Sequence, residues 1–340
     1  MNKKSVTFGV AGCGNIGRRH VHLLNTLEST NLAGIYEVVD SRGKEYSESY
    51  NCRLYDTYQQ MLDDKSVQVV SICTPHGLHA EMSIQASEAG KHVLVEKPMA
   101  LSVEDCNKMI DAARQNDVRL LVVKQNRFNV PIGLTREALV SGKLGKIYMV
   151  ECNVMWNRNQ EYYTDSNWRG KRDLEGGALY TQVSHFIDLL IWWFGNITKA
   201  HTHLSTRNHD IEIEDCGHSM LEFDSGVTGV LNWTTCVYNK NYEGSITIIG
   251  EKGTIKIGGR YLNKIEFWDV MSHPLPEDIE YVDKPNDYGS KYQGSSSNHD
   301  KLYQNVAAAL LNERHHVIEG DEGIKTIEAI ELIYGSKVNQ

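Results

Sequence analysis

The chain opens on an apolar strand that leads directly into a glycine-rich turn. Residues 6–17 read V-T-F-G-V-A-G-C-G-N-I-G, which spaces Gly12, Gly14 and Gly17 as G-x-G-x-x-G. Such a turn brings backbone N–H groups and a helix N-terminus up to a pyrophosphate. Glycine is needed because a Cβ would block the tight turn, the phosphate approach and the helix–strand contact. The motif favours a dinucleotide-binding turn over a structural turn that happens to match.

The residues after the turn supply the context that the motif requires. A helix is predicted from Asn15 to Thr26, and a second apolar strand begins at Leu32. Glu37 follows Gly17 by about twenty residues, where the fingerprint has an acid for the ribose hydroxyls. A carboxylate there repels a 2′-phosphate, so Glu37 favours NAD over NADP.

Two neighbours leave alternatives open around that acid. Asp40 is a second candidate for the ribose contact, because the predicted end of a strand is uncertain by a few residues. Arg42 can serve a 2′-phosphate, stack on adenine, or lie as a solvated surface residue.

Strands and helical patterns alternate over the first part of the chain, which predicts a parallel, doubly wound sheet. The predicted strands are Val6–Ala11, Leu32–Glu37, Val67–Thr74, His92–Val95 and Arg119–Val123. Helical patterns between them include Leu78–Glu88 and Val103–Gln115. We therefore expect an α/β fold whose first domain covers residues 1–125.

Residues 126–340 carry a different pattern and are expected to form a second domain. Long alternating strands dominate it and predict an α+β fold with a large, open, mostly antiparallel sheet. The predicted strands are Lys146–Trp156, Ala200–Thr206, Asp215–Phe223, Thr228–Cys236, Gly244–Ile249 and Thr254–Ile257. The predicted helices are Ile132–Ser141, Ala178–Phe194, Asp300–Leu311 and Glu322–Gly335, and Pro274–Asn298 is expected to be a long loop.

Composition limits the partners that this chain can have. A net charge of −9 and a pI near 5.9 over 340 residues argue against binding nucleic acid or an anionic membrane. The seven cysteines are scattered without a C-x-x-C pair, which indicates reduced thiols and excludes a cysteine zinc cluster. The first strand begins too early to leave room for a signal peptide. We expect a cytoplasmic protein with no metal site.

Two loops follow predicted strands of the first domain at the edge where ligands bind in doubly wound sheets. One reads Thr74-Pro75-His76-Gly77, and the other reads Glu96-Lys97-Pro98. A cation at Lys97 could hold a substrate hydroxyl and stabilise a developing oxyanion. The alternative is a surface lysine paired with Glu96.

His185 is the candidate base of the second domain. It follows a pair of glycines in G-G-A-L-Y-T-Q-V-S-H-F-I-D, and Asp188 lies one helical turn later. An imidazole is well matched to removing a proton from an alcohol near neutral pH. Asp188 can pair with His185 or bind other buried polar groups, and most histidines in a chain with 14 are structural.

A loop between Trp156 and Arg172 combines aromatic and basic residues. It contains Arg158, Tyr163 and the run W-R-G-K-R, which suit a flat base together with phosphates or a carboxylate. The alternative is an exposed charged loop packed by its two tryptophans. Motifs of other enzyme classes, G-x-S-x-G, H-E-x-x-H and the Walker lysine motif, do not occur.

Four segments together give the chain a recognisable pattern. V-A-G-C-G-N-I-G-R-R-H, C-T-P-H-G-L-H, V-E-K-P-M-A and G-G-A-L-Y-T-Q-V-S-H-F-I-D resemble the Gfo/Idh/MocA oxidoreductases nearly end to end. The resemblance implies a Rossmann domain, a second domain with a large sheet, and dimers or tetramers formed through that sheet. It also implies that Lys97 and His185 flank the reacting carbon.

A narrower resemblance points to WlbA-type enzymes, which oxidise C3 of UDP-N-acetylglucosaminuronate for surface polysaccharide. It is carried by segments such as V-V-K-Q-N-R, N-Q-E-Y-Y, I-E-I-E-D and L-Y-Q-N-V. One position departs from the pattern: Thr181 stands where the wider family usually has Asp and this group tends to Asn. Threonine can hydrogen-bond but cannot act as a base, so His185 is left with more of the catalytic role.

The motifs and the resemblance together predict an NAD-dependent sugar dehydrogenase. The expected catalytic residues are Lys97, His185 and Thr181. The expected cofactor contacts are Gly12, Gly14, Asn15, Ile16, Gly17, Glu37, Thr74, Pro75, His79, Glu96, Lys97 and Gln125. The expected substrate contacts are Lys97, Asn126, Arg158, Tyr163, Trp168, Arg169, Gln182 and His185. The alternatives are a dehydrogenase of a free sugar or an inositol, and a nucleotide-sensing regulatory protein without turnover.

Overall fold

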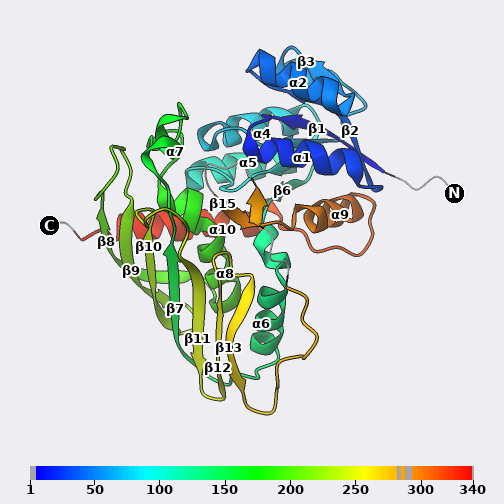
Figure 1. Cartoon of the computed structure of the whole chain (residues 1–340). Helices are drawn as coiled ribbons and strands as arrows, with labels where there is room; N and C mark the ends of the chain where they lie inside the picture. Colours follow the sequence, from blue (N-terminus) through cyan, green and yellow to red (C-terminus); the bar gives the residue numbers. More distant parts are fainter. Residues whose placement is uncertain (1–4, 282–284, 288–292, 339–340) are drawn as a thin grey trace. The chain divides into compact units, whose positions relative to one another are not determined.

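The computed structural model describes residues 5–281, 285–287 and 293–338 (Figure 1). The chain forms two compact units. The first contains Met1–Lys124 and His299–Ile327, and the second contains Gln125–Asn298 and Glu328–Gln340. Each unit is described by itself. Within the described residues, none of the helices has the length and apolar character needed to cross a membrane.

A six-stranded parallel sheet forms the centre of the first unit, as predicted. Its strands are β1 (Val6–Ala11), β2 (Thr30–Tyr36), β3 (Arg53–Tyr55), β4 (Val69–Ile72), β5 (His92–Val95) and β6 (Leu120–Val122), in the order β3-β2-β1-β4-β5-β6. The central strands are buried along nearly their whole length, as expected for a parallel sheet covered on both faces. Since β1, β4 and β5 are neighbours, the loops after them lie along one edge.

Helices connect these strands and cover the sheet. They are α1 (Asn15–Thr26), α2 (Asp40–Tyr50), α3 (Tyr58–Asp63), the short 3-10 helix η1 (His76–Leu78), α4 (His79–Glu88) and α5 (Val103–Gln115). Helix α9 (His299–Leu310) also belongs here, because it packs against α1 and β2. The predicted division at residue 125 assigned residues 299–327 to the second domain, so the structure differs there.

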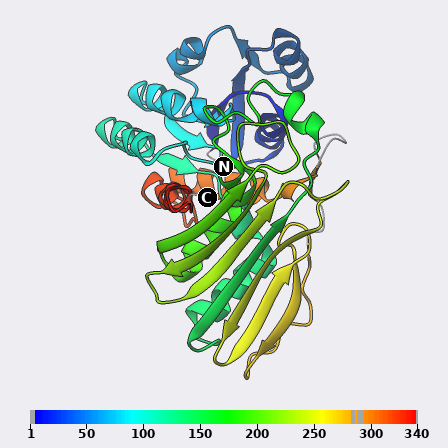
Figure 2. The same ribbon diagram turned by 90° about the vertical axis from the view of Figure 1, so that its left-hand side faces the viewer.

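The second unit is built on a seven-stranded, mostly antiparallel sheet, which agrees with the predicted fold (Figure 2). Its strands are β7 (Ile147–Met155), β8 (Ile197–Ser205), β9 (Cys216–Phe223), β10 (Thr228–Thr234), β11 (Glu243–Gly250), β12 (Gly253–Gly258) and β13 (Lys264–Val270), in the order β13-β12-β11-β7-β10-β9-β8. Burial alternates along β9 and β10, so one face is covered and the other is open. The open face exposes Met149, Met220 and Ile249.

The remaining elements position the candidate site. They are the 3-10 helix η2 (Gln125–Phe128), α6 (Val130–Val140), α7 (Gln160–Thr164), the π-helical turn η3 (Leu179–Val183), α8 (Ser184–Phe194) and α10 (Gly320–Gly335). The predicted loop 274–298 lies partly outside the described residues, and its described part contains the short strands β14 (Pro285–Asp287) and β15 (Gln293–Ser296).

Candidate active site

The three glycines of the first turn are required for different reasons. Gly12 has φ +88°, and a Cβ there would lie 2.9 Å from the carbonyl of Cys73. A Cβ on Gly17 would collide with the carbonyl oxygen of Gly12. A Cβ on Gly14 would meet no heavy atom within 4 Å. The fold therefore requires Gly12 and Gly17, whereas at Gly14 the open space fits the approach of a pyrophosphate.

Helix α1 begins directly at this open space. Gly14 occupies its N-cap position, and the first helical residues are the exposed Asn15 and the half-buried Ile16. The positive end of the helix dipole favours an anion there. The turn thus has the geometry and the electrostatics that a dinucleotide requires.

Glu37, rather than Asp40, is the acid beside the glycine turn. Its Oε2 accepts a hydrogen bond from the N–H of Cys13 at 2.7 Å, and its Oε1 accepts one from the N–H of Val39 at 2.8 Å. Arg42 lies 3.3 Å from the same carboxylate and is half exposed. Asp40 is paired with Lys44 at the exposed start of α2. The group that contacts the turn is therefore the Glu37 carboxylate, and the Arg42 guanidinium is paired with that carboxylate.

The loops after β4 and β5 are held together by His79. Its Nδ1 lies 2.7 Å from the carbonyl oxygen of Pro98, and its Nε2 lies 2.9 Å from that of Thr74. Burial lowers the pKa of His79. A neutral imidazole has one N–H, so it donates to one of the two carbonyls at a time. His79 therefore acts as a link between the two loops.

Thr74 and Lys97 are the candidate ligand contacts at this edge. The hydroxyl of Thr74 is buried and has no hydrogen-bond partner, and the half-buried Pro75 follows it before η1. Lys97 is half buried and precedes a cis peptide bond to Pro98. Glu96 is buried, and its Oε2 accepts the N–H of Lys97 at 3.0 Å.

His185 lies in the second unit near the start of α8 and is buried. The side-chain nitrogen of Gln125 lies 3.4 Å from its Nε2. The neighbouring Asn126 is also buried, and its Oδ1 has no hydrogen-bond partner. Asp188, which the sequence offered as a partner of His185, accepts two hydrogen bonds of 2.8 Å from Arg127. This bidentate ion pair holds η2 against α8.

The π-helical turn before α8 carries Thr181 and Gln182. The Thr181 hydroxyl donates to the carbonyl of Gly177 at 3.2 Å, and the Gln182 amide donates to the Tyr162 hydroxyl at 3.3 Å. One continuous helix was predicted over residues 178–194; the structure instead has a π-helical stretch over its first turn. Single π-turns of this kind are frequent at functional sites, because they change the direction of the side chains that follow.

The aromatic and basic loop is packed rather than extended into solvent. Arg158 is 4% exposed, donates to the Oδ1 of Asn241 at 3.2 Å, and lies between the rings of Trp156 and Tyr162. Tyr163 is buried with its hydroxyl 3.2 Å from that of Thr235, and burial raises its pKa.

Arg169 and Trp168 are the half-buried members of the same loop. The Arg169 guanidinium lies 4.1 Å from the centre of the Tyr162 ring and 5.4 Å from that of Trp168. Arg172, which is exposed, binds the main-chain carbonyl of Glu212. Of the predicted arginine contacts, Arg169 is the better placed to meet a ligand, whereas Arg158 is part of the loop's own core.

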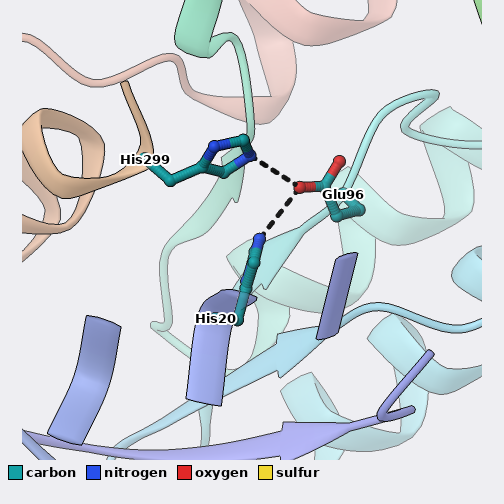
Figure 3. A group of neighbouring side chains, drawn as sticks. All are labelled: His20, Glu96 and His299. Atoms are coloured by element: carbon teal, nitrogen blue, oxygen red, sulfur yellow. Dashed lines mark hydrogen bonds and ion pairs between the residues drawn. The ribbon is translucent and has the colours of Figure 1, made fainter. Parts of the chain in front are cut away.

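Sequence reasoning missed the partners of Glu96. His20 on α1 lies 2.9 Å from its Oε1, and His299 at the start of α9 lies 3.4 Å from the same oxygen (Figure 3). His20 ends the G-R-R-H segment of the glycine turn, and that position was a usable signal. His299 is one of 14 histidines and lies in no motif.

Comparison with known proteins agrees with this architecture. Residues 6–124 match the model of an oxidoreductase family with an NAD-binding Rossmann fold. Residues 134–256 match the model of the GFO/IDH/MocA C-terminal domain. The WlbA dehydrogenase from Bordetella pertussis, solved in complex with NADH and UDP-GlcNAcA, is 34% identical. That match covers 98% of this chain and 96% of that chain, with a TM-score of 0.89.

The chain belongs to the Gfo/Idh/MocA family. It is an NAD-dependent oxidoreductase, and its first unit is the Rossmann domain that binds the dinucleotide. A second WlbA dehydrogenase, from Chromobacterium violaceum and also in complex with NADH and UDP-GlcNAcA, is 36% identical. That match covers 99% of this chain and 94% of the other, with a TM-score of 0.90. The glucose-6-phosphate 3-dehydrogenase of Bacillus subtilis is 23% identical, covering 98% of this chain and 96% of that protein.

Proposed function

We propose that this enzyme oxidises the C3 hydroxyl of UDP-N-acetylglucosaminuronate (UDP-GlcNAcA) with NAD as the hydride acceptor. The observation that carries the proposal is the similarity, over nearly the whole length of both chains, to two dehydrogenases solved with NADH and UDP-GlcNAcA. The chain is then a sugar dehydrogenase acting on a CH–OH group.

In this proposal two side chains work on the reacting hydroxyl. Lys97 positions the C3 hydroxyl and stabilises the oxyanion that develops on it. His185 removes the hydroxyl proton as general base. Thr181 contributes a hydrogen bond but no base. The bound cofactor supplies the acceptor for the hydride from C3. Lys97 belongs to the first unit and His185 to the second, so their approach to one substrate is part of the proposal.

The cofactor is proposed to lie on the glycine turn. Gly14 leaves room for the pyrophosphate, and Glu37 faces the ribose hydroxyls. The hydroxyl of Thr74, which has no partner in the protein, donates a hydrogen bond to the cofactor or accepts one from it. The proposed cofactor contacts also include Pro75, which is half buried, and His79, Glu96 and Gln125, which are buried.

The substrate is an anion with a pyrophosphate and a carboxylate, so a protein of net charge −9 must bind it with local cations. Arg169 is half buried beside Trp168 and can present a bidentate fork. Asn126 offers a buried oxygen that has no hydrogen-bond partner, which suits a sugar hydroxyl. Tyr163, Gln182 and Arg158 shape the wall behind these contacts.

We further propose that the enzyme acts in the cytoplasm, in the synthesis of nucleotide sugars for surface polysaccharide. It would do so as a homo-oligomer, a dimer or a tetramer, joined through the open face of the seven-stranded sheet. Exposed Met149 on β7, Met220 on β9 and Ile249 on β11 support this, since burying them against another copy removes apolar surface from water.

Calorimetric titration of the NAD-loaded protein tests the substrate. UDP-GlcNAcA is expected to bind and to give NADH, which is followed by absorbance. The uncharged parent UDP-N-acetylglucosamine is expected to bind one to two decades more weakly, because losing a charge-assisted contact costs roughly 1.5–3 kcal/mol.

The other outcomes separate the alternatives. Equal affinities for the two nucleotides would remove the carboxylate from the proposal. Oxidation of a free sugar or an inositol without nucleotide binding would favour a family dehydrogenase of another substrate. Nucleotide binding without NADH production would indicate a regulatory protein.

A further inference from the structure

A single buried carboxylate joins three elements of the first unit. Glu96 directly follows β5 and is 5% exposed. Its Oε1 lies 2.9 Å from the Nε2 of His20 on α1 and 3.4 Å from the Nε2 of His299 at the start of α9. Figure 3 shows both imidazoles directed at this one oxygen. The second oxygen accepts the main-chain N–H of Lys97 at 3.0 Å. Both oxygens are thus used within the protein.

The other nitrogen of His20 continues the network. Its Nδ1 lies 2.8 Å from the hydroxyl of Tyr303 and 2.9 Å from that of Ser71, and these hydroxyls are 3.0 Å apart. One proton arrangement satisfies this chain: Ser71 donates to Tyr303, Tyr303 donates to His20, and His20 donates to Glu96. Burial raises the pKa of Tyr303, so its phenol keeps the proton that it donates.

Glu96 is ionised at neutral pH. Burial by itself would raise the pKa of Glu96, but its two imidazole neighbours, His20 first and then His299, hold it well below its usual range. Burial lowers the pKa of His299 to about 4, so this imidazole is neutral near pH 7. The result is an ionised carboxylate directly before Lys97 in the chain.

Two histidines and a carboxylate could also bind a metal ion, and their ligand atoms all lie within 4.8 Å of one another. The separation of 2.9 Å between His20 and Glu96 is that of a direct hydrogen bond, however. The second carboxylate oxygen is already engaged by Lys97. The geometry therefore fits a hydrogen-bonded network.

We propose that Glu96 is a positioning residue for Lys97, and that His20, His299 and Tyr303 hold it in place. The network ties the lysine loop after β5 to α1, the helix that starts at the glycine turn. It would therefore keep the lysine in register with the cofactor-binding turn. This inference rests on the proposed function, in which Lys97 holds the reacting hydroxyl.

Tyr303→Phe tests the network with a small change. It removes one of the two hydroxyls that contact the Nδ1 of His20, and it keeps the ring contact with Phe8, whose ring centre is 5.3 Å away. Tyr58→Phe is the matched control, because Tyr58 is also a buried tyrosine of the first unit, and its hydroxyl donates to the carbonyl of Met82 at 2.8 Å. Tyr303→Phe loses the contacts of a buried hydroxyl with His20 and Ser71, and Tyr58→Phe loses the hydrogen bond of a buried hydroxyl to Met82.

The readout is turnover of UDP-GlcNAcA in a double-mutant cycle with Lys97→Ala. Tyr303→Phe is expected to lower kcat about tenfold with an unchanged Kd for NADH, and to have no further effect when Lys97 is already alanine. Tyr58→Phe is expected to leave kcat unchanged. An equal effect of Tyr303→Phe in both backgrounds would overturn the proposal, as would metal analysis finding one bound ion per chain.

Two measurements need no substrate and so separate this inference from the proposed function. In Tyr303→Phe, the main-chain N–H of Lys97 should exchange with deuterium faster, and the acetylation rate of the Lys97 amine should change, both followed by mass spectrometry. Tyr58→Phe should match the wild type. Unchanged exchange and acetylation in Tyr303→Phe would contradict the network even if no turnover of UDP-GlcNAcA were found.

Discussion

Glu96 in the first unit and Glu214 in the second are both buried glutamates, with exposed fractions of 5% and 8%. Their pKa values nevertheless move in opposite directions. That of Glu96 lies well below the usual range, whereas burial raises that of Glu214 to about 7. The donors to Glu214 include the hydroxyl of Tyr334 at 2.7 Å and the N–H of Ala178 at 3.0 Å.

The comparison shows that burial does not fix the charge of a carboxylate; its donors do. The imidazoles of His20 and His299 offset the cost of burial at Glu96, whereas a phenol and main-chain amides offset less of it at Glu214. The two residues also lie next to different parts of the candidate site. Glu96 precedes Lys97, and Glu214 accepts a hydrogen bond from Ala178, which follows the Gly176-Gly177 pair before His185.

The largest expected effect is the loss of either candidate catalytic residue. Lys97→Ala and His185→Ala should each lower kcat by about a hundredfold to ten-thousandfold, the usual scale for general acid–base groups. NADH binding, measured by fluorescence, should survive in both, because neither residue lies in the glycine turn. Near-normal turnover in either variant would remove that residue from the proposed mechanism.

Glu214→Gln tests whether the two glutamates affect the pH dependence of the free energy of unfolding in opposite directions. The folded pKa of Glu214 is raised above the unfolded value of 4.5, so its stabilising contribution is present below pH 4.5 and is lost as pH rises through about 7. That pKa difference corresponds to roughly 3 kcal/mol. The variant should therefore match the wild type near pH 5 and be more stable near pH 8.

Urea unfolding of both proteins at the two pH values measures this difference. Glu96 should show the opposite sign, since its pKa is lowered and its contribution is lost on acidification below pH 4.5. If Glu214→Gln is no more stable than the wild type at pH 8, the pKa of Glu214 is not raised in the folded protein, and its carboxyl group ionises near its ordinary pKa.

Glu37 extends the comparison to a carboxylate that is proposed to meet a ligand. Glu37→Ser should narrow the preference for NAD over NADP by about tenfold, or roughly 1.4 kcal/mol, since the charge that repels a 2′-phosphate is removed. Asp40→Ser is the control, because Asp40 is an exposed acid of the same segment. Titration with NADH and NADPH gives both affinities. Tighter NADPH binding by the wild type would assign the dominant role to Arg42.

The smallest effect is expected at Thr74. Thr74→Val removes a buried hydroxyl that has no partner in the protein, so stability should not fall. NADH affinity should drop by about threefold to tenfold, the value of one hydrogen bond of roughly 0.5–1.5 kcal/mol. Thr135→Val removes another unpartnered buried hydroxyl, on α6, and should leave NADH affinity unchanged. An equal affinity in both variants would exclude a cofactor contact at Thr74.

The elements that the sequence predicted well are those with strong local patterns. The bounds of α1 (Asn15–Thr26), β5 (His92–Val95) and α5 (Val103–Gln115) agree with the prediction residue for residue. The edge strands β3 (Arg53–Tyr55) and β13 (Lys264–Val270) were missed. β3 has only three residues, and β13 is largely exposed, so neither has a clear local pattern. Their strand conformation depends on pairing with a neighbouring strand.

The residues of the candidate site that could be predicted from the sequence are those that come shortly after a strand of the parallel sheet. Thr74 and Lys97 are found in this way, because the loops after parallel strands share one edge of the sheet. His299 and Tyr303, which complete the network around Glu96, were not predictable, since they lie about two hundred residues further along the chain and only the folded topology brings them together. The packing of Arg158 between two aromatic rings has no local signal either.

The contrast among the three glycines of the first turn has a practical consequence. Positions 12 and 17 are fixed by the chain's own backbone, but a methyl group at position 14 would touch nothing in the protein. Gly14→Ala should therefore fold like the wild type while obstructing the pyrophosphate. Mixed with active copies in the proposed homo-oligomer, such a subunit would bind no cofactor. It would then report whether turnover in one protomer depends on cofactor bound to its neighbour.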